Sequence, residues 1–154
     1  MNDAETRQIC TFNIDDRLLG VDILDVKEIN TETQFTPIYH APREVRGYVK
    51  IRGQIHLILD LRPIMELPEE PPDAESRLIL FKPGVGENFG ILVDRIRDVM
   101  EIHADMVEDR RKTDAGVPDA GDRRALGMGS GVCKLEDGLL IVLDSRQLLG
   151  RIES

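Results

Sequence analysis

Short apolar runs separated by Gly, Pro, Asn and Asp recur along the chain, and few of them have helical spacing. In the first run Cys10, Phe12 and Ile14 alternate with other residues, which is the period of a half-buried strand. The pattern predicts an all-β protein, with strands at residues 7–14, 18–24, 26–35, 47–52, 54–60, 77–82, 88–94, 96–102, 131–135 and 139–144. Short helices are expected at 61–67, where Pro63 lies near the start, and at 145–152.

This pattern occurs twice in the chain. Residues 19–29 (LGVDILDVKEI) align without a gap to 89–99 (FGILVDRIRDV), at an offset of 70 residues. Residues 47–65 align to 131–149 at an offset of 84, so the second half carries a longer middle loop. Matched pairs include Gly20 with Gly90, Gly47 with Gly131, Glu28 with Asp98, Lys50 with Lys134, Asp60 with Asp144 and Arg62 with Arg146. The repeat indicates an internal duplication.

The duplication predicts two similar five-stranded barrels within a single domain at 7–150. Their approximate bounds are 7–67 and 76–150, and an exchange of strands between them is possible. A unit of this size buries too little surface to be stable alone, so we expect the barrels to pack on a shared hydrophobic core. Three prolines predict an extended linker at 68–75, and the polar, Gly-rich segment 103–130 is expected to be a mobile loop.

The chain has 154 residues and a formal net charge of −9. This balance argues against nucleic acid or an anionic membrane as the partner, because binding phosphates requires clustered positive charge. The basic groups at 110–112 and 123–124 are interleaved with acidic residues and lack aromatic neighbours. No apolar segment approaches the roughly 20 residues that span a bilayer, and the first residues do not resemble a signal peptide. We expect a cytosolic protein whose partner is a protein or a small ligand.

Little in the sequence points to catalysis or to a cofactor. Cys10 and Cys133 lie in apolar segments and are expected to be buried, reduced thiols, with a disulfide or a metal pair as the alternative. The segment GVGENFG at 84–90 precedes an apolar strand instead of a helix, which predicts a hairpin turn instead of a phosphate loop. The histidines lack metal-ligand spacing; they are His40, His56 and His103.

Arg52 and Gly53 interrupt an apolar stretch between two predicted strands. The repeat places Glu136 and Asp137 at the same turn, so the positive charge is particular to the first half. Arg52 is either a solvated turn residue or a guanidinium held for ion pairing, within the protein or across an interface. Glu28 is the candidate partner by charge.

Four segments in this order resemble the CheW family of chemotaxis coupling proteins: GVDILDVKEI, REVRGYVKIRGQIHLILDLR, FGILVDRIRDVMEI and GVCKLEDGLLIVLD. The resemblance covers nearly the whole chain, from Ile9 to Gly150. It implies two SH3-like five-stranded barrels with short helices, no catalytic activity and no cofactor. It also implies an adaptor, monomeric when alone, that joins the cytoplasmic tips of methyl-accepting chemoreceptors to the regulatory domain of the histidine kinase CheA in membrane-associated receptor arrays.

The resemblance also implies which residues contact the partners. Glu28 and Arg52 match charged positions associated with receptor coupling. Val26 matches the apolar groove contacted by the receptor, and Gly47 and Gly53 match the turn glycines around it. A docked receptor helix also needs an apolar floor, for which Val26, Val93 and Val99 are the candidates. The competing hypothesis is a barrel that binds a small ligand or acts as an enzyme, with polar groups converging in a pocket of several hundred cubic ångströms.

Overall fold

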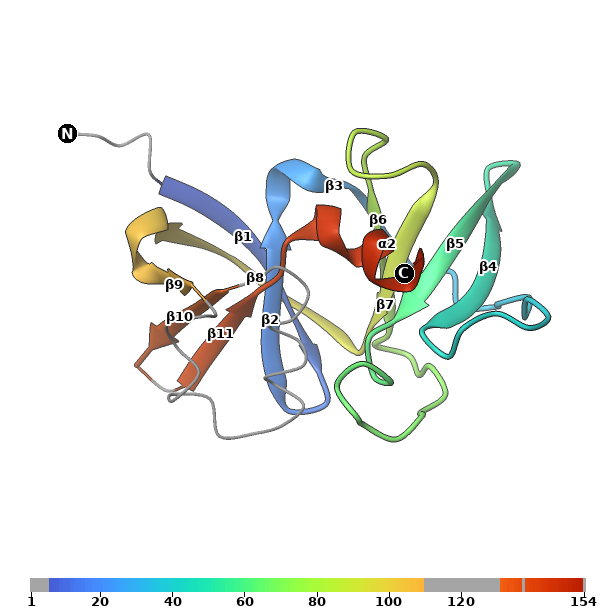
Figure 1. Cartoon of the computed structure of the whole chain (residues 1–154), viewed down its shortest axis with the longest axis horizontal. Coiled ribbons are helices and arrows are strands. Elements are labelled where there is room, and N and C mark those ends of the chain that lie inside the picture. Colours follow the sequence, from blue (N-terminus) through green and yellow to red (C-terminus); the bar gives the residue numbers. More distant parts are fainter. Residues whose placement is uncertain (1–5, 110–130, 137, 154) are drawn as a thin grey trace.

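We describe a computed structural model of the chain over residues 6–109, 131–136 and 138–153. It contains two sheets whose strand pairs are mostly antiparallel. The sheets lie side by side, and one α-helix lies in front of them (Figure 1). The strands are β1 (Thr6–Ile14), β2 (Arg17–Asp22), β3 (Val26–Asn30), β4 (Val45–Ile51), β5 (Gln54–Asp60), β6 (Arg77–Phe81), β7 (Phe89–Val93), β8 (Arg95–His103), β9 (Val107–Asp109), β10 (Gly131–Leu135) and β11 (Gly138–Val142). The helices are α2 (Ser145–Glu153) and the 3-10 turns η2 (Ile23–Asp25) and η3 (Ala104–Met106).

The two sheets each combine strands from both halves of the chain. The six-stranded sheet has the order β8-β1-β2-β11-β10-β9, and the five-stranded sheet has the order β3-β6-β7-β5-β4. The first half therefore gives β1 and β2 to one sheet and β3 to β5 to the other, and the second half does the reverse. The sheets do not coincide with the approximate bounds 7–67 and 76–150, because the strand exchange that the duplication allowed is present and reciprocal.

The exchange has the same register in both sheets. A parallel ladder joins β5 to β7, with Ile58 opposite Gly90, and another joins β11 to β2, with Val142 opposite Gly20. Gly20 is the repeat of Gly90, and Val142 is the repeat of Ile58 at the offset of 84. The two halves thus interlock through equivalent contacts, which supports the duplication read from the sequence.

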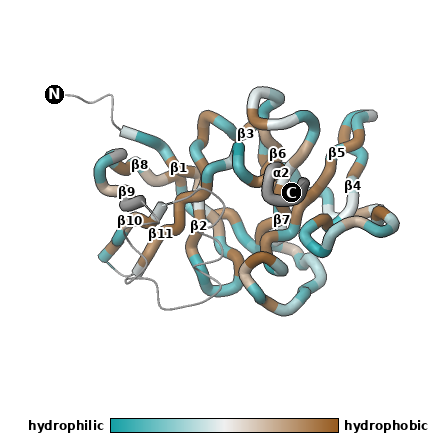
Figure 2. The backbone as a smooth tube through the Cα atoms, in the orientation of Figure 1, coloured by the Kyte–Doolittle hydropathy of each residue, from teal (hydrophilic) through white to brown (hydrophobic). Residues whose placement is uncertain are grey.

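Apolar side chains form three clusters. In Figure 2, which colours the chain by residue hydropathy, many of the most hydrophobic residues lie on the strands. The largest cluster contains residues of both sheets and is the shared core expected from the sequence; it includes Phe12, Leu19, Val21, Leu59, Ile79, Phe81, Phe89, Ile91, Val93, Val132, Ile141 and Leu148. A second cluster fills the five-stranded barrel and a third fills the six-stranded one. The predicted fold class, an all-β protein of two SH3-like barrels on a shared core, is confirmed.

Most predicted elements are present, with two differences. All ten predicted strands are found, and β9 is an additional strand inside the segment expected to be a loop at 103–130. The segment 61–67 is a tight turn and not a helix, because the Leu67 amide donates to the Arg62 carbonyl (2.9 Å) and Glu66 has a φ of +60°. Residues 110–130, including both basic groups, lie outside the described residues.

Three further expectations concern the linker, the thiols and the turn at 84–90. The segment 68–75 contains no strand or helix. Cys10 and Cys133 are buried and form no disulfide among the described residues, and burial raises the pKa of the Cys10 thiol. The turn at 84–90 joins the antiparallel pair β6 and β7, and its residue with positive φ is Asn88 (+45°) instead of a glycine.

Among the described residues no helix is long and apolar enough to cross a membrane.

Candidate functional site

The hairpin β4–β5 turns through two residues only, Arg52 and Gly53. Their φ angles are +50° and +81°, and positive φ at both central positions is the type I′ geometry that matches the twist of paired strands. The repeated hairpin β10–β11 also turns through two residues, because Leu135 pairs with Gly138. The turn is therefore part of the duplicated fold, while the arginine is present in the first half alone.

Arg52 forms an ion pair with Glu28, the partner that its charge predicted. Its Nη2 contacts Glu28 Oε1, and Glu28 Oε2 accepts a hydrogen bond from Asn30 Nδ2 at 3.0 Å. The hydrogen bond from Asn30, followed by that from Arg52, lowers the pKa of the Glu28 carboxyl. The Arg52 side chain is 66% exposed and that of Glu28 is 24% exposed, so the guanidinium remains open to a second partner.

This ion pair links the two ends of the five-stranded sheet. Glu28 lies on β3 and Arg52 directly follows β4, and these strands are the first and last of the sheet. A second link is the two-way backbone pairing of Thr36 with Tyr48, at 2.8 and 2.9 Å. Gly47 is required beside it, since its φ is +142° and a Cβ there would lie 2.4 Å from the Thr36 carbonyl oxygen.

The three valines expected to form an apolar floor are placed differently from one another. Val26 is half-buried on β3 and packs against the shared core. Val99 is 53% exposed on β8, which is an end strand of the other sheet. Val93 has no exposed surface and belongs to the shared core, so it cannot contact a partner at the surface. The expectation for Val93 is corrected on this ground, because β7 is buried on both faces.

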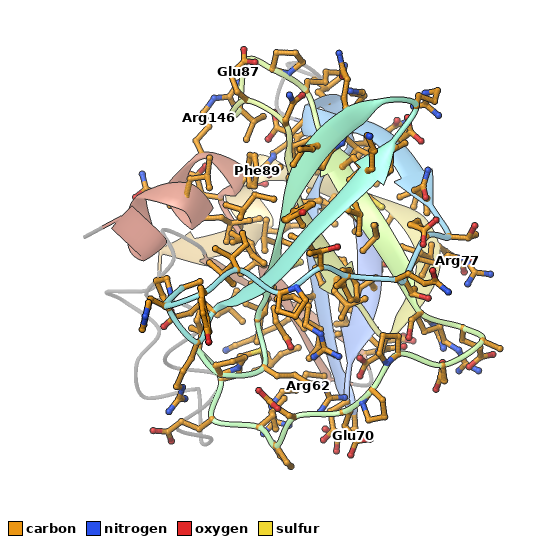
Figure 3. All side chains as sticks on the ribbon, turned by 90° about the vertical axis from the view of Figure 1, so that its right-hand side faces the viewer. Arg62, Glu70, Arg77, Glu87, Phe89 and Arg146 are labelled. Carbon is orange, nitrogen blue, oxygen red and sulfur yellow. The ribbon has the colours of Figure 1, made fainter. Side chains whose placement is uncertain are left out.

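Two arginines form ion pairs at the points where the chain passes from one sheet to the other. Arg62 Nη2 pairs with Asp94 Oδ2 at 2.5 Å, between β7 and β8. Arg146 Nη1 pairs with Asp25 Oδ1 at 3.1 Å, between β2 and β3. Arg62 and Arg146 are repeats of each other, and in the view of Figure 3 Arg146 lies in the upper part and Arg62 in the lower part. The sequence did contain a signal for this role, the repeated Asp-x-Arg at the end of each hairpin, although its partners could not be inferred from spacing.

The two crossing points differ in burial. The Arg62 side chain is 9% exposed and also donates from Nη1 to the Pro68 carbonyl at 3.0 Å, which fixes the start of the linker near Glu70 (Figure 3). The Arg146 side chain is 58% exposed. Since a buried ion pair that loses one partner leaves an uncompensated charge, we infer that Arg62 matters more for the fold than Arg146.

Apolar side chains cluster inside each barrel, and the described surface has open hollows. One has a volume of about 570 Å³ and is lined by Pro37, Arg43, Val45, Arg46, Asp60, Glu69, Glu70 and Pro71. Another, of about 420 Å³, is lined by Glu32, Gln34, Thr36, Tyr48, Val49, Lys50 and Ile55. The described residues contain no cluster of His, Cys, Asp and Glu suited to a metal ion.

Comparison with known proteins gives consistent matches over nearly the full length. The model of the CheW-like domain family matches residues 8–153. The chemotaxis protein CheW of Treponema pallidum is 28% identical over 152 residues, covering 97% of this chain and 85% of that protein. The chemotaxis protein CheW of Klebsiella aerogenes is 26% identical over 148 residues, covering 96% and 84%.

A solved structure has the same fold. The scaffolding protein TtCheW from Thermoanaerobacter tengcongensis superposes with a TM-score of 0.69 at 23% identity, covering 88% of this chain and 87% of that one. The observed fold, with its duplicated hairpins and shared core, is consistent with the match of the family model to residues 8–153. The chain belongs to the CheW-like domain family.

Proposed function

We propose that this protein couples the cytoplasmic tips of chemoreceptors to a CheA-type histidine kinase, and that it does so in the cytoplasm at membrane-associated receptor arrays. As a CheW-like protein it is a scaffold of the chemotaxis type and not an enzyme. The observation that carries the proposal is the match of the CheW-like family model to residues 8–153.

The charged pair Arg52–Glu28 is the candidate contact for the receptor. A helix that docks on a partner needs an apolar surface and a few charges that set its register. Arg52 is the more exposed member of the pair, and Val26 lies two positions from Glu28 on the same strand. Gly47 and Gly53 shape the backbone around the pair and have no side chain to offer a partner.

The kinase contact is expected on the remaining barrel surface. Val99 was assigned to the apolar floor for a receptor helix, and it is half exposed on the end strand β8, so its side chain is available to the receptor. Individual contacts of this kind are weak, and the repetition of many couplers in one array provides attachment by avidity. The isolated protein is therefore expected to be a monomer.

The test is co-purification of the full chain with a receptor cytoplasmic fragment and a CheA-type kinase from the same cell. Arg52→Glu and Glu28→Arg are each expected to reduce receptor retention by about tenfold, since each turns an attraction into a repulsion, while the protein stays folded. The double variant restores the internal ion pair but leaves the charges exchanged, so receptor retention is expected to remain low.

Arg95→Glu is a matched control, because Arg95 forms an exposed ion pair with Glu75 at 2.9 Å elsewhere on the surface. It is expected to leave retention unchanged. If both reversals at Arg52 and Glu28 bind the receptor as the unaltered chain does, these residues are not the receptor contact. If the unaltered chain retains neither receptor nor kinase, the proposed function itself is wrong.

A further inference from the structure

Asn30 joins the charged pair Arg52–Glu28 to the backbone that follows β3. Its Nδ2 donates to Glu28 Oε2 at 3.0 Å, and its Oδ1 accepts from the Glu32 amide at 2.8 Å. One end of the side-chain amide is a donor and the other is an acceptor, so these two bonds together fix the orientation of the group. Asn30 therefore holds Glu28 through a side chain that is itself anchored to the main chain.

The two oxygens of the Glu28 carboxylate have different partners. Oε2 is held by Asn30, whereas Oε1 contacts Arg52 Nη2. An ion pair between flexible side chains near the surface is weak, because its attraction is offset by the loss of side-chain freedom. The bond from Asn30 restricts the carboxylate to one orientation before the ion pair forms, and so reduces that loss. Glu28 is thus oriented for Arg52 by a third residue.

The charge state of Glu28 agrees with this geometry. The hydrogen bond from Asn30 is the largest cause of the lowered pKa of the Glu28 carboxyl, ahead of the hydrogen bond from Arg52. A donor to the ionised form favours that form, so Asn30 keeps the carboxylate charged as well as oriented. Because its amide is neutral, Asn30 does this without adding a charge to the surface.

The duplicated fold forms without an asparagine at this position. β8 is the repeat of β3, and at the offset of 70 residues the place of Asn30 is taken by Met100, which packs against the apolar cluster of the six-stranded barrel. The place of Arg52 is taken by Glu136. The six-stranded barrel therefore folds with neither residue, and the first half carries both of them around Glu28. This pattern favours a role for Asn30 at the charged pair over a role in folding.

We propose that Asn30 is a positioning residue for the receptor contact: its side-chain amide orients the Glu28 carboxylate toward Arg52, and the receptor binds the pair in this arrangement. The part of the inference that concerns the receptor rests on the proposed function. The part that concerns the orientation of Glu28 involves this chain alone.

Two substitutions separate the donor of Asn30 from its acceptor. Asn30→Asp keeps an oxygen for the Glu32 amide but has no donor for Glu28, and Asn30→Met removes both groups without adding a charge. In each variant the Glu28 carboxyl, followed by NMR in the full chain, is expected to titrate at a higher pH than in the unaltered chain. Retention of the receptor fragment is expected to fall about fivefold in both.

Thr31→Asp is the matched control for the added charge, because Thr31 is the exposed neighbour of Asn30 and its replacement leaves the amide in place. It is expected to retain the receptor within about twofold of the unaltered chain. The NMR spectra of each variant also report whether it is folded.

Three results would overturn the proposal. In the first, Glu28 titrates in Asn30→Met as it does in the unaltered chain. In the second, Asn30→Asp retains the receptor as the unaltered chain does, which is the result expected if Asn30 only anchors the backbone. In the third, Thr31→Asp lowers retention as much as Asn30→Asp. Failure of the proposed function is recognised separately, because the unaltered chain then retains no receptor, while the titration of Glu28 still decides whether Asn30 orients it.

Discussion

Arg52 is not explained by its contribution to the stability of the fold. A left-handed backbone conformation costs a residue with a side chain about 1–2 kcal/mol, which glycine or asparagine largely avoids. An exposed ion pair such as that with Glu28 returns only about 0.2–1 kcal/mol. The residue is therefore retained at a net disadvantage to folding, which is consistent with a contact outside the molecule.

Replacing Arg52 by asparagine separates these two effects. Asn tolerates positive φ, so Arg52→Asn is expected to keep or slightly raise the free energy of unfolding, by up to about 1 kcal/mol, while receptor retention falls. Urea unfolding and the co-purification assay measure the two quantities. A clear loss of stability in this variant would show that the ion pair, and not the turn, dominates at this position.

Glu28 predicts a pH dependence of stability. Its folded-state pKa is lowered from the usual 4.5, chiefly by the hydrogen bond from Asn30, so the ionised form is favoured in the folded protein. The stability that this provides is fully present above about pH 4.5 and is lost as the pH falls through the lowered value. Urea midpoints at pH 7 and pH 3 are expected to differ less in Glu28→Gln than in the unaltered chain. Equal differences in both proteins would contradict this assignment.

For single residues, the sequence correctly predicted the ion pair between Arg52 and Glu28 but did not predict the burial of Val93. Arg52 and Glu28 were matched by charge and by their places in the repeat, and the structure pairs them. Val93 was assigned to the apolar floor for a receptor helix because it is an apolar residue of a predicted strand. Its burial depends on what covers the strand, which the local pattern does not encode.

At the scale of the element, β7 shows why alternation fails in the centre of this fold. Every residue of the strand is buried. Phe89, Ile91 and Val93 face the shared core, whereas Leu92 faces the interior of the five-stranded barrel. In a strand that is buried on both faces, the apolar residues form a continuous run. The sequence of such a strand does not indicate which residues face the shared core and which face the barrel interior.

The burial of Val93 gives a direct test of this placement. Val93→Asp is expected to lower the free energy of unfolding by more than about 4 kcal/mol, because the carboxylate has no partner in the core. Val99→Asp, at a position that is 53% exposed, is the control and is expected to change it by less than about 0.5 kcal/mol. Thermal unfolding followed by circular dichroism measures both. Similar melting temperatures for the two variants would contradict the register of β7.

Short elements were the least predictable. β9 has three residues, which is too few to show a period, and it lies in a polar stretch that was interpreted as a loop. The turn at 61–67 has the apolar spacing of a helix, but Glu66 has a φ of +60° and the Leu67 amide donates to the Arg62 carbonyl, so the chain turns away after a single turn. In both cases tertiary contacts decide the structure.

At the scale of the whole molecule, the all-β architecture and the duplication were predictable, while the exchange between halves was only a possibility. Periodicity identifies strands and buried faces, but it does not state which strand pairs with which. Four ladders join the halves: β1 with β8, β2 with β11, β3 with β6, and β5 with β7. Neither half could keep its observed pairing without the other.

This interlocking predicts the behaviour of a cut chain. A protease site placed between Glu70 and Pro71, in the linker, is expected to be cleaved without separating the two fragments, because the linker takes no part in the four ladders. Size-exclusion chromatography under native conditions is expected to show one species of the original size, and a denaturing gel two bands. Dissociation of the fragments at micromolar concentration would contradict the dominance of the ladders over the linker.

The equal registers at Gly20 and Gly90 also bear on the history of the molecule. Two copies of a half-length polypeptide that exchanged their first two strands would form a symmetric homodimer with these pairings, and fusion of the two genes would leave one chain with the pairings unchanged. In these terms residues 68–75 are the junction between former subunits. Arg52 and Glu136 occupy equivalent turns of the two hairpins, so they mark where two originally identical surfaces have become different.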